Sequence, residues 1–85
     1  HPIAGAEKSG PDAANAELFR DRKTLLTPVA ETSREAVDRV RALWRACGAE
    51  VREMTPQAHD AVFATVSHLP HLLAYALVHE VASQP

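Results

Sequence analysis

Apolar residues fall in four stretches of the chain, and their spacing differs between the stretches. Residues 23–29 (KTLLTPV) are mostly apolar and close at Pro28, which predicts a strand near a sheet edge. Residues 49–54 (AEVREM) predict a second, shorter strand. Between them apolar residues recur every three or four positions, which predicts a helix with one apolar stripe of Val37, Val40, Trp44 and Cys47. A long apolar segment from residue 56 onward predicts a final helix.

Residues at the ends of the two predicted helices match known capping patterns. Thr32 stands three residues before Glu35, the capping-box spacing, so we expect the first helix to open at Thr32. Gly48 is placed to end this helix as a left-handed cap. Thr55, followed by Pro56 at the first helical position, opens the last helix.

The order strand, helix, strand, helix predicts an α/β fold, with a helix packed on a sheet. Residues 1–22 hold two of the three glycines and two prolines, so we expect mostly loop there, with a helical turn at 13–19. Two strands do not form a stable sheet alone, so we expect further strands upstream. The chain begins at His1 without an initiator methionine, which also favours a fragment of a larger protein.

Composition excludes several classes of protein. The chain has 85 residues, 46% hydrophobic and 24% charged, and a formal net charge of −2. Without a basic surplus to neutralise phosphates, we expect no nucleic acid partner. We find no uncharged apolar run long enough to span a bilayer and expect no membrane partner. Cys47 is the single cysteine, so no internal disulfide can form, and we expect a reducing, cytoplasmic location.

Histidines interrupt the apolar pattern of the last helix in the stretch VSHLPHLLAYALVHE. At 100° per residue, one narrow face carries His68, His71, Tyr75 and His79. Pro70 removes a backbone donor and its ring opposes the Val66 carbonyl, so we expect a kink and a local pocket between His68 and His71. Because apolar residues cover the rest of the helix, we expect it to be buried between neighbours.

Alternative interpretations of these histidines stay open on the pattern alone. We interpret His59 and His79 as the polar side of a surface helix, whereas His68 and His71 fit a surface or a pocket equally well. Two histidines three residues apart can bind zinc, but a site needs three or four ligands. Cys47 lies on another helix, at a position that packing explains, so we predict no metal site.

The segment HPIAG at residues 1–5 is a second candidate for chemistry. A residue before proline is held extended, so the imidazole of His1 is presented from a stiff loop. With a pKa near neutrality, histidine is the usual acceptor of a proton from a hydroxyl group. By itself the segment is also compatible with a turn at the end of a strand.

Together, HPIAGAEKSG, ELFRDRKTLLTP, and LWRACGAEVREMTPQAHDAVFATVSHLPH, in this order, resemble the prephenate and arogenate (cyclohexadienyl) dehydrogenase family. The resemblance covers nearly the whole chain. It implies that residues 1–54 end a Rossmann-type dinucleotide-binding domain, and that residues 55–85 begin an all-helical dimerisation domain. The implied activity is oxidative decarboxylation of prephenate or arogenate in tyrosine biosynthesis, with hydride transfer to NAD or NADP. The implied partners are this small substrate and a second copy of the protein.

The resemblance also implies roles for single residues. His1 matches the histidine that hydrogen-bonds the substrate hydroxyl and assists its deprotonation. Ser67, His68 and His71 match the SHLPH motif that lines the substrate pocket, and Glu7 matches an acid at the pocket mouth in some members. These 85 residues contain no GxGxxG loop, so we expect the fragment alone to be inactive. The alternatives are a non-enzymatic helical dimerisation module and a histidine metal site.

Overall fold

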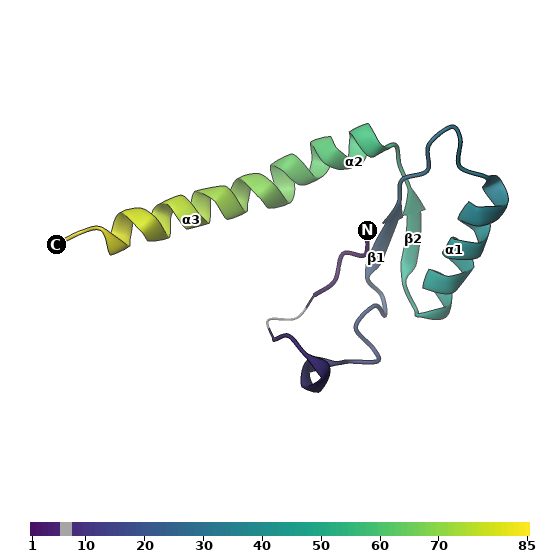
Figure 1. The fold of residues 1–85 in the computed structure, drawn as a ribbon, viewed down its shortest axis with the longest axis horizontal. Helices are drawn as coiled ribbons and strands as arrows, with labels where there is room; N and C mark the ends of the chain where they lie inside the picture. Colours follow the sequence, from purple (N-terminus) through teal and green to yellow (C-terminus); the bar gives the residue numbers. More distant parts are fainter. Residues whose placement is uncertain (6–7) are drawn as a thin grey trace.

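The computed structural model describes residues 1–5 and 8–85 and has the predicted α/β order (Figure 1). A 3₁₀ turn at Pro11–Ala13 precedes strand β1, Lys23–Leu26. Helix α1, Arg34–Ala46, leads to strand β2, Glu50–Glu53. The chain then continues as helix α2, Pro56–Phe63, a π-helical turn, Ala64–His68, and helix α3, Leu69–Ala82. The fold class is therefore confirmed.

Strands β1 and β2 pair in parallel, with Lys23 opposite Glu50 and Leu26 opposite Glu53. A parallel pair needs a crossover connection, and α1 supplies it. Both strands are shorter than predicted, because β1 ends at Leu26, before Thr27 and Pro28, and β2 excludes Ala49. Pro28 has no N–H to donate to a ladder, which agrees with an early end of the strand.

The first residues of the chain also join the sheet, although the sequence predicted a loop there. Pro2 forms an antiparallel bridge with Thr24, so the first residues of the chain pair with β1 in addition to β2. The N–H of Ile3 donates to the Lys23 carbonyl at 2.8 Å, and the N–H of Leu25 donates to the His1 carbonyl at 2.9 Å. Pro2 therefore occupies a position that needs no N–H donor.

Helix α1 begins one residue later than the capping-box spacing predicted. Ser33 is the N-cap, and its hydroxyl accepts a hydrogen bond from the Ala36 N–H at 3.1 Å. Thr32 is used outside the helix, where its hydroxyl accepts from the Val29 N–H at 3.1 Å. Gly48 has a φ of 86°, which confirms the predicted left-handed end of the helix.

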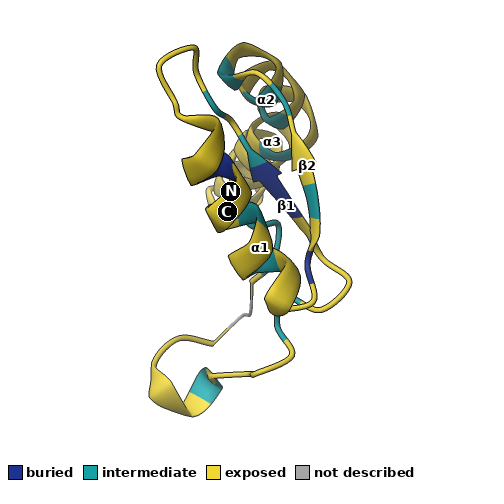
Figure 2. Ribbon diagram, turned by 90° about the vertical axis from the view of Figure 1, so that its right-hand side faces the viewer, coloured by how far each residue is buried: buried dark blue, intermediate teal, exposed yellow. Residues whose placement is uncertain are grey.

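The core is small and lies between β1 and α1 (Figure 2). Its buried residues are Thr24, Leu25, Val37 and Ala49. The predicted stripe of α1 contributes Val37 to this core and leaves Trp44 half-buried, whereas Val40 is 42% exposed. Cys47 is exposed at the C-cap, so the prediction that packing explains its position is wrong.

Residues 56–82 form one long helical rod that extends away from the sheet (Figure 1). Where we predicted a kink at Pro70, a π-helical turn precedes the proline, and the N–H of Leu69 donates to the Ala64 carbonyl. This wider turn accommodates a residue that cannot donate its own backbone hydrogen bond.

The apolar surface of the rod is not covered by the rest of the chain, contrary to the prediction of burial. Apart from half-buried Phe63, its large apolar residues are 45–75% exposed, for example Val66 at 62% and Leu72 at 65%. The rod has 27 residues and contains an 18-residue window with a mean hydropathy of 1.5, so it is long and apolar enough to cross a membrane, by length and composition only. The prediction that no uncharged apolar run is long enough to span a bilayer is therefore wrong.

Candidate functional site

His1 is fixed by its backbone to the inner strand of the sheet. Its amino group donates to the carbonyl oxygen of Leu25 at 2.8 Å, and its carbonyl accepts from the N–H of the same residue at 2.9 Å. This pair of hydrogen bonds holds the residue in the extended conformation that Pro2 favours. The imidazole is therefore carried by a rigid ladder and not by a free loop.

The side chain of His1 meets the first turns of the helical rod. Its Nδ1 lies 2.7 Å from Nε2 of His59, a residue 58 positions later in the sequence. Phe63, one turn after His59, stacks on that histidine with ring centroids 4.7 Å apart, and its ring centroid is 4.9 Å from that of His1. These three rings form a cluster, here called the imidazole cluster, where the sheet meets the rod.

Asp60 adds a carboxylate to the imidazole cluster. Its Oδ1 lies 3.0 Å from Nδ1 of His59, so His59 has a polar partner at each ring nitrogen. The side chain of His59 is 18% exposed, whereas that of Asp60 is 82% exposed. Solvent therefore reaches the carboxylate, while the side chain of His59 is mostly covered.

An open hollow of about 360 Å³ adjoins His1 on the side of α1. Its walls are His1, residues 25–28, Thr32, and the α1 residues Ala36, Val37, Val40 and Trp44. The hollow lies at the carboxyl end of β1, the end at which open α/β sheets usually bind ligands. His1 is thus the titratable side chain in the wall of a mainly apolar space.

The SHLPH residues follow the imidazole cluster along the rod. Ser67 is half-buried and continues the face that carries His59 and Phe63, because these residues are four positions apart. His68 and His71 are exposed, about 14 and 18 Å further along the axis than His59 at 1.5 Å per residue. The structure does not bring these two histidines into the imidazole cluster. Glu7 lies outside the described residues.

A metal centre has no support in the part of the chain that the structure describes. There, no three His, Cys, Asp or Glu side chains come together in a group that could hold a metal ion. The imidazole cluster contributes two histidines whose facing nitrogens are already joined to each other.

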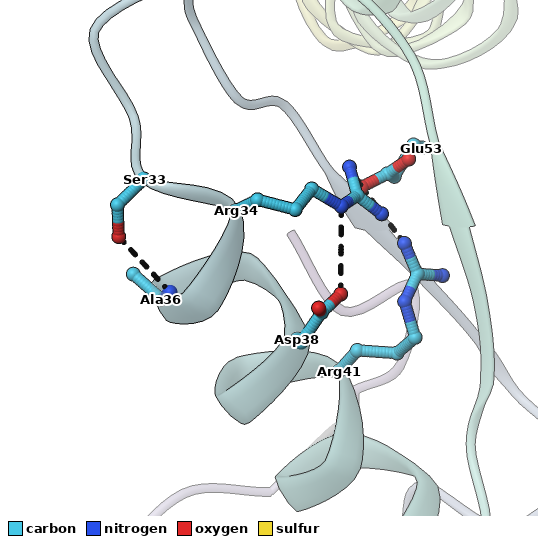
Figure 3. A network of polar contacts seen from close by, with 6 residues as sticks. All are labelled: Ser33, Arg34, Ala36, Asp38, Arg41 and Glu53. Carbon is cyan, nitrogen blue, oxygen red and sulfur yellow. Dashed lines mark hydrogen bonds and ion pairs between the residues drawn. The ribbon is translucent and has the colours of Figure 1, made fainter.

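A second polar network joins α1 to the end of β2 (Figure 3). Oε1 of Glu53 accepts from Arg34 and from Arg41, each at 2.8 Å, and Arg34 also lies 3.5 Å from Asp38. The hydrogen bond from Arg34 is the main cause that lowers the pKa of Glu53 below its ordinary value, with Coulombic attraction to both arginines adding to it. This network positions the helix on the sheet, and it does not contact the imidazole cluster.

His59 and Phe63 are the functional candidates that sequence reasoning missed. We interpreted His59 as the polar side of a surface helix, but it is half-buried and bonded to His1. The four-residue step from His59 to Phe63 was visible in the sequence. Nothing in the sequence pattern showed that His1 would lie against this step.

Comparison with family models assigns both parts of the chain. Residues 1–53 match the model described as prephenate dehydrogenase, nucleotide-binding domain. Residues 55–85 match the model described as prephenate dehydrogenase, dimerization domain.

Individual relatives agree with these matches. The chain is 45% identical over 78 residues to the cyclohexadienyl dehydrogenase of Zymomonas mobilis and 41% identical over 80 residues to the prephenate dehydrogenase of Bacillus subtilis. These alignments cover 92% and 94% of the chain, but only 27% and 22% of the relatives. The chain thus spans about a quarter of the length of the curated relatives it matches.

A solved structure matches the whole chain. It is the prephenate dehydrogenase of Aquifex aeolicus in complex with hydroxyphenyl propionate and NAD⁺, with a TM-score of 0.93 and 41% sequence identity. The match covers 100% of this chain and 30% of that one. The strand, helix and strand followed by the rod are therefore the end of a Rossmann-like domain and the start of a helical one.

Proposed function

Because the chain belongs to the prephenate dehydrogenase family, we propose that it forms the domain junction of an enzyme that oxidatively decarboxylates prephenate or arogenate. The observation that carries the proposal is the position of His1. Its imidazole lies where the sheet meets the rod, at the carboxyl end of β1 and beside an open hollow. A substrate bound between the two domains would contact this side chain.

His1 is the proposed acceptor for the hydroxyl group of the substrate. As a hydride leaves the ring carbon that bears the hydroxyl, this group gains C=O character and its proton becomes more acidic. The bond to the departing carboxylate then breaks, carbon dioxide leaves, and the electron pair of that bond completes the aromatic ring. A neutral imidazole that accepts the hydroxyl hydrogen bond lowers the barrier to the first step.

Ser67, His68 and His71 are the proposed wall for the polar groups of the substrate. Support from the structure comes from Ser67, which is half-buried and lies one turn beyond Phe63 of the imidazole cluster. His68 and His71 are proposed on the resemblance alone. Hydroxyl and imidazole groups suit the carboxylates of prephenate as hydrogen-bond donors. Glu7 is kept as a proposed acid at the pocket mouth, on the resemblance alone.

NAD or NADP is the proposed cofactor, and the nicotinamide supplies the hydride acceptor when bound. The 85 residues of this chain fit only part of a site for NAD or NADP. They provide parallel strands with an open hollow at their carboxyl end, but no GxGxxG loop that would bind a pyrophosphate. Pyrophosphate binding therefore needs residues beyond these 85, and the fragment alone is proposed to be inactive.

A second copy of the chain is the proposed protein partner, through the helical domain. The exposed apolar residues of the rod support it, together with the dimerization domain to which residues 55–85 are similar. A dimer interface explains this apolar surface without a membrane. A net charge of −2 argues against nucleic acid, and we propose a cytoplasmic location.

Replacing His1 by asparagine in the full-length protein tests the proposal. We expect His1→Asn to lower kcat about 10²- to 10⁴-fold, the usual contribution of a general base, with KM little changed. The measurement is steady-state reduction of NAD⁺ with prephenate or arogenate. His79→Asn is the matched control, because His79 is exposed near the far end of the rod. Unchanged turnover in His1→Asn would contradict the role assigned to His1, whereas an inactive wild-type protein would favour a non-enzymatic dimerisation module.

A further inference from the structure

We propose that His59 is a positioning residue that, together with Asp60, fixes the tautomer of His1 so that His1 keeps a free lone pair on Nε2. The placement of the hydrogen atoms follows from the two distances and from the donor and acceptor chemistry of an ionised carboxylate and neutral imidazoles. Its consequence for turnover rests on the proposed function of His1 as the acceptor for the substrate hydroxyl.

The three side chains form a chain of hydrogen bonds in which each donor can be assigned. Oδ1 of Asp60 lies 3.0 Å from Nδ1 of His59, and an ionised carboxylate can only accept, so Nδ1 of His59 carries a hydrogen. In a neutral imidazole the other nitrogen is then bare. Nε2 of His59 therefore accepts the 2.7 Å hydrogen bond from Nδ1 of His1.

It follows that the hydrogen of neutral His1 is on Nδ1 and that its Nε2 is unprotonated. Which ring nitrogen of a histidine carries the proton is set by the hydrogen bond that the other nitrogen makes. Without His59, Nδ1 of His1 would have no assigned acceptor among its described contacts, and its tautomer would be free to change. His59 thus selects the form of His1 that can accept a hydroxyl hydrogen.

Packing of the rings holds this arrangement in place. Phe63 stacks on His59 at an angle of 29°, and His59 meets His1 edge-on with ring centroids 5.0 Å apart. With its side chain 18% exposed, His59 has little room to rotate away from either neighbour. By stacking on His59, Phe63 therefore helps to orient the hydrogen bond between His1 and His59.

The same chain of hydrogen bonds also suits the charged form of His1. When Nε2 takes up a proton, the N–H at Nδ1 already points at a neutral acceptor, and the far nitrogen of that acceptor is bonded to a carboxylate. The positive charge is stabilised without movement of a heavy atom. Asp60 acts on His1 only through His59.

The tautomer of His1 can be measured directly in the full-length protein labelled with ¹⁵N-histidine. We expect long-range ¹H–¹⁵N spectra to show His1 with a protonated Nδ1 and a bare Nε2. His59→Asn should shift His1 toward the form protonated at Nε2, because the shorter amide cannot reach it. His59→Gln, whose amide can occupy the position of Nε2, should restore the original form. Protonation of Nε2 in the wild type, or an unchanged tautomer in His59→Asn, would overturn the proposal.

Asp60→Asn gives a second test that does not depend on the fold of the His59 variants, since this side chain is 82% exposed. An amide can donate as well as accept, so it no longer fixes the hydrogen of His59. We expect a mixture of His1 tautomers in this variant. A single, unchanged tautomer would exclude a role for Asp60.

Steady-state kinetics of the same variants link the tautomer to turnover. We expect His59→Asn to lower kcat roughly 10- to 100-fold with KM nearly unchanged, a smaller loss than that from removing His1, and His59→Gln to recover most of it. If His1→Asn is inactive while His59→Asn keeps full kcat, the positioning role is overturned and the proposed function stands. If His1→Asn keeps full turnover, the role proposed for His1 fails, and the NMR measurement still decides the tautomer.

Discussion

At the scale of single residues, one carboxylate can join two elements of the fold. Glu53 ends β2 and accepts from Arg34 and Arg41 of α1, and its folded pKa is lowered mainly by the hydrogen bond from Arg34. A group with a lowered folded pKa stabilises the fold above its ordinary pKa, where it is ionised. This contribution is lost as the pH falls through the lowered pKa and Glu53 becomes protonated.

We therefore expect Glu53→Gln to lower the thermal unfolding midpoint of the full-length protein near neutral pH. The difference from the wild type should shrink in acid, because both proteins are then uncharged at this position. Glu50→Gln is the control, since the ion pair of Glu50 is with Arg52 of the same strand. Differential scanning calorimetry over a pH series measures both shifts. An equal or larger effect of Glu50→Gln would contradict the bridging role of Glu53.

At the scale of elements, helix and strand ends depend on a few backbone positions. Gly48 ends α1 with a φ of 86° and accepts, through its carbonyl, the N–H of Asp21 at 2.9 Å. A Cβ at this position would lie 3.2 Å from the Cα of Arg20. The turn from α1 into β2 therefore needs a residue without a side chain, for reasons of both conformation and space.

Gly48→Ala should reduce the free energy of unfolding by about 1–3 kcal/mol, the cost of a left-handed non-glycine residue. Gly5→Ala is the matched control, because its φ is not positive and nothing lies within 4 Å of the added Cβ. Denaturant unfolding of the two full-length variants measures the difference in free energy of unfolding. Equal m-values would show that the difference is one of stability. A stability of Gly48→Ala equal to that of Gly5→Ala would show that the turn relaxes without strain.

At the scale of the whole molecule, the sheet and the rod have very different surroundings. The sheet has a small core against α1, whereas the rod projects from it over a molecule 59 Å long with its apolar residues exposed (Figure 1). Exposed apolar surface of this extent marks an interaction site. The match of residues 55–85 to a dimerization domain agrees with this and supports the proposed second copy of the protein as the partner.

A charge placed on this apolar surface should weaken the proposed dimer. We expect Leu73→Glu, at a residue that is 60% exposed, to shift the full-length protein from dimer to monomer by light scattering after gel filtration. Gln57→Glu adds the same charge to an exposed polar position of α2 and should leave the mass unchanged. Circular dichroism confirms that both variants keep their helices. A dimer of unchanged mass and affinity in Leu73→Glu would place the interface elsewhere.

The sequence by itself determined the order of elements, both helices, the left-handed end at Gly48 and the candidacy of His1, because periodicity, capping and backbone preference are local properties. It misplaced the N-cap by one residue, since Thr32 and Ser33 are both good caps and only the fold chose between them. The prediction that the last helix is buried was also wrong, because the residues that cover a helix belong to other parts of the protein.

Only the tertiary structure decided that His1 and His59, 58 positions apart, share a hydrogen bond. That contact depends on residues 1–3 pairing with β1, a long-range ladder with no sequence signal, and on the direction in which the rod leaves β2. The chemistry available to His1 was readable from its residue type. Which of its nitrogens is free depends on a neighbour that only folding supplies.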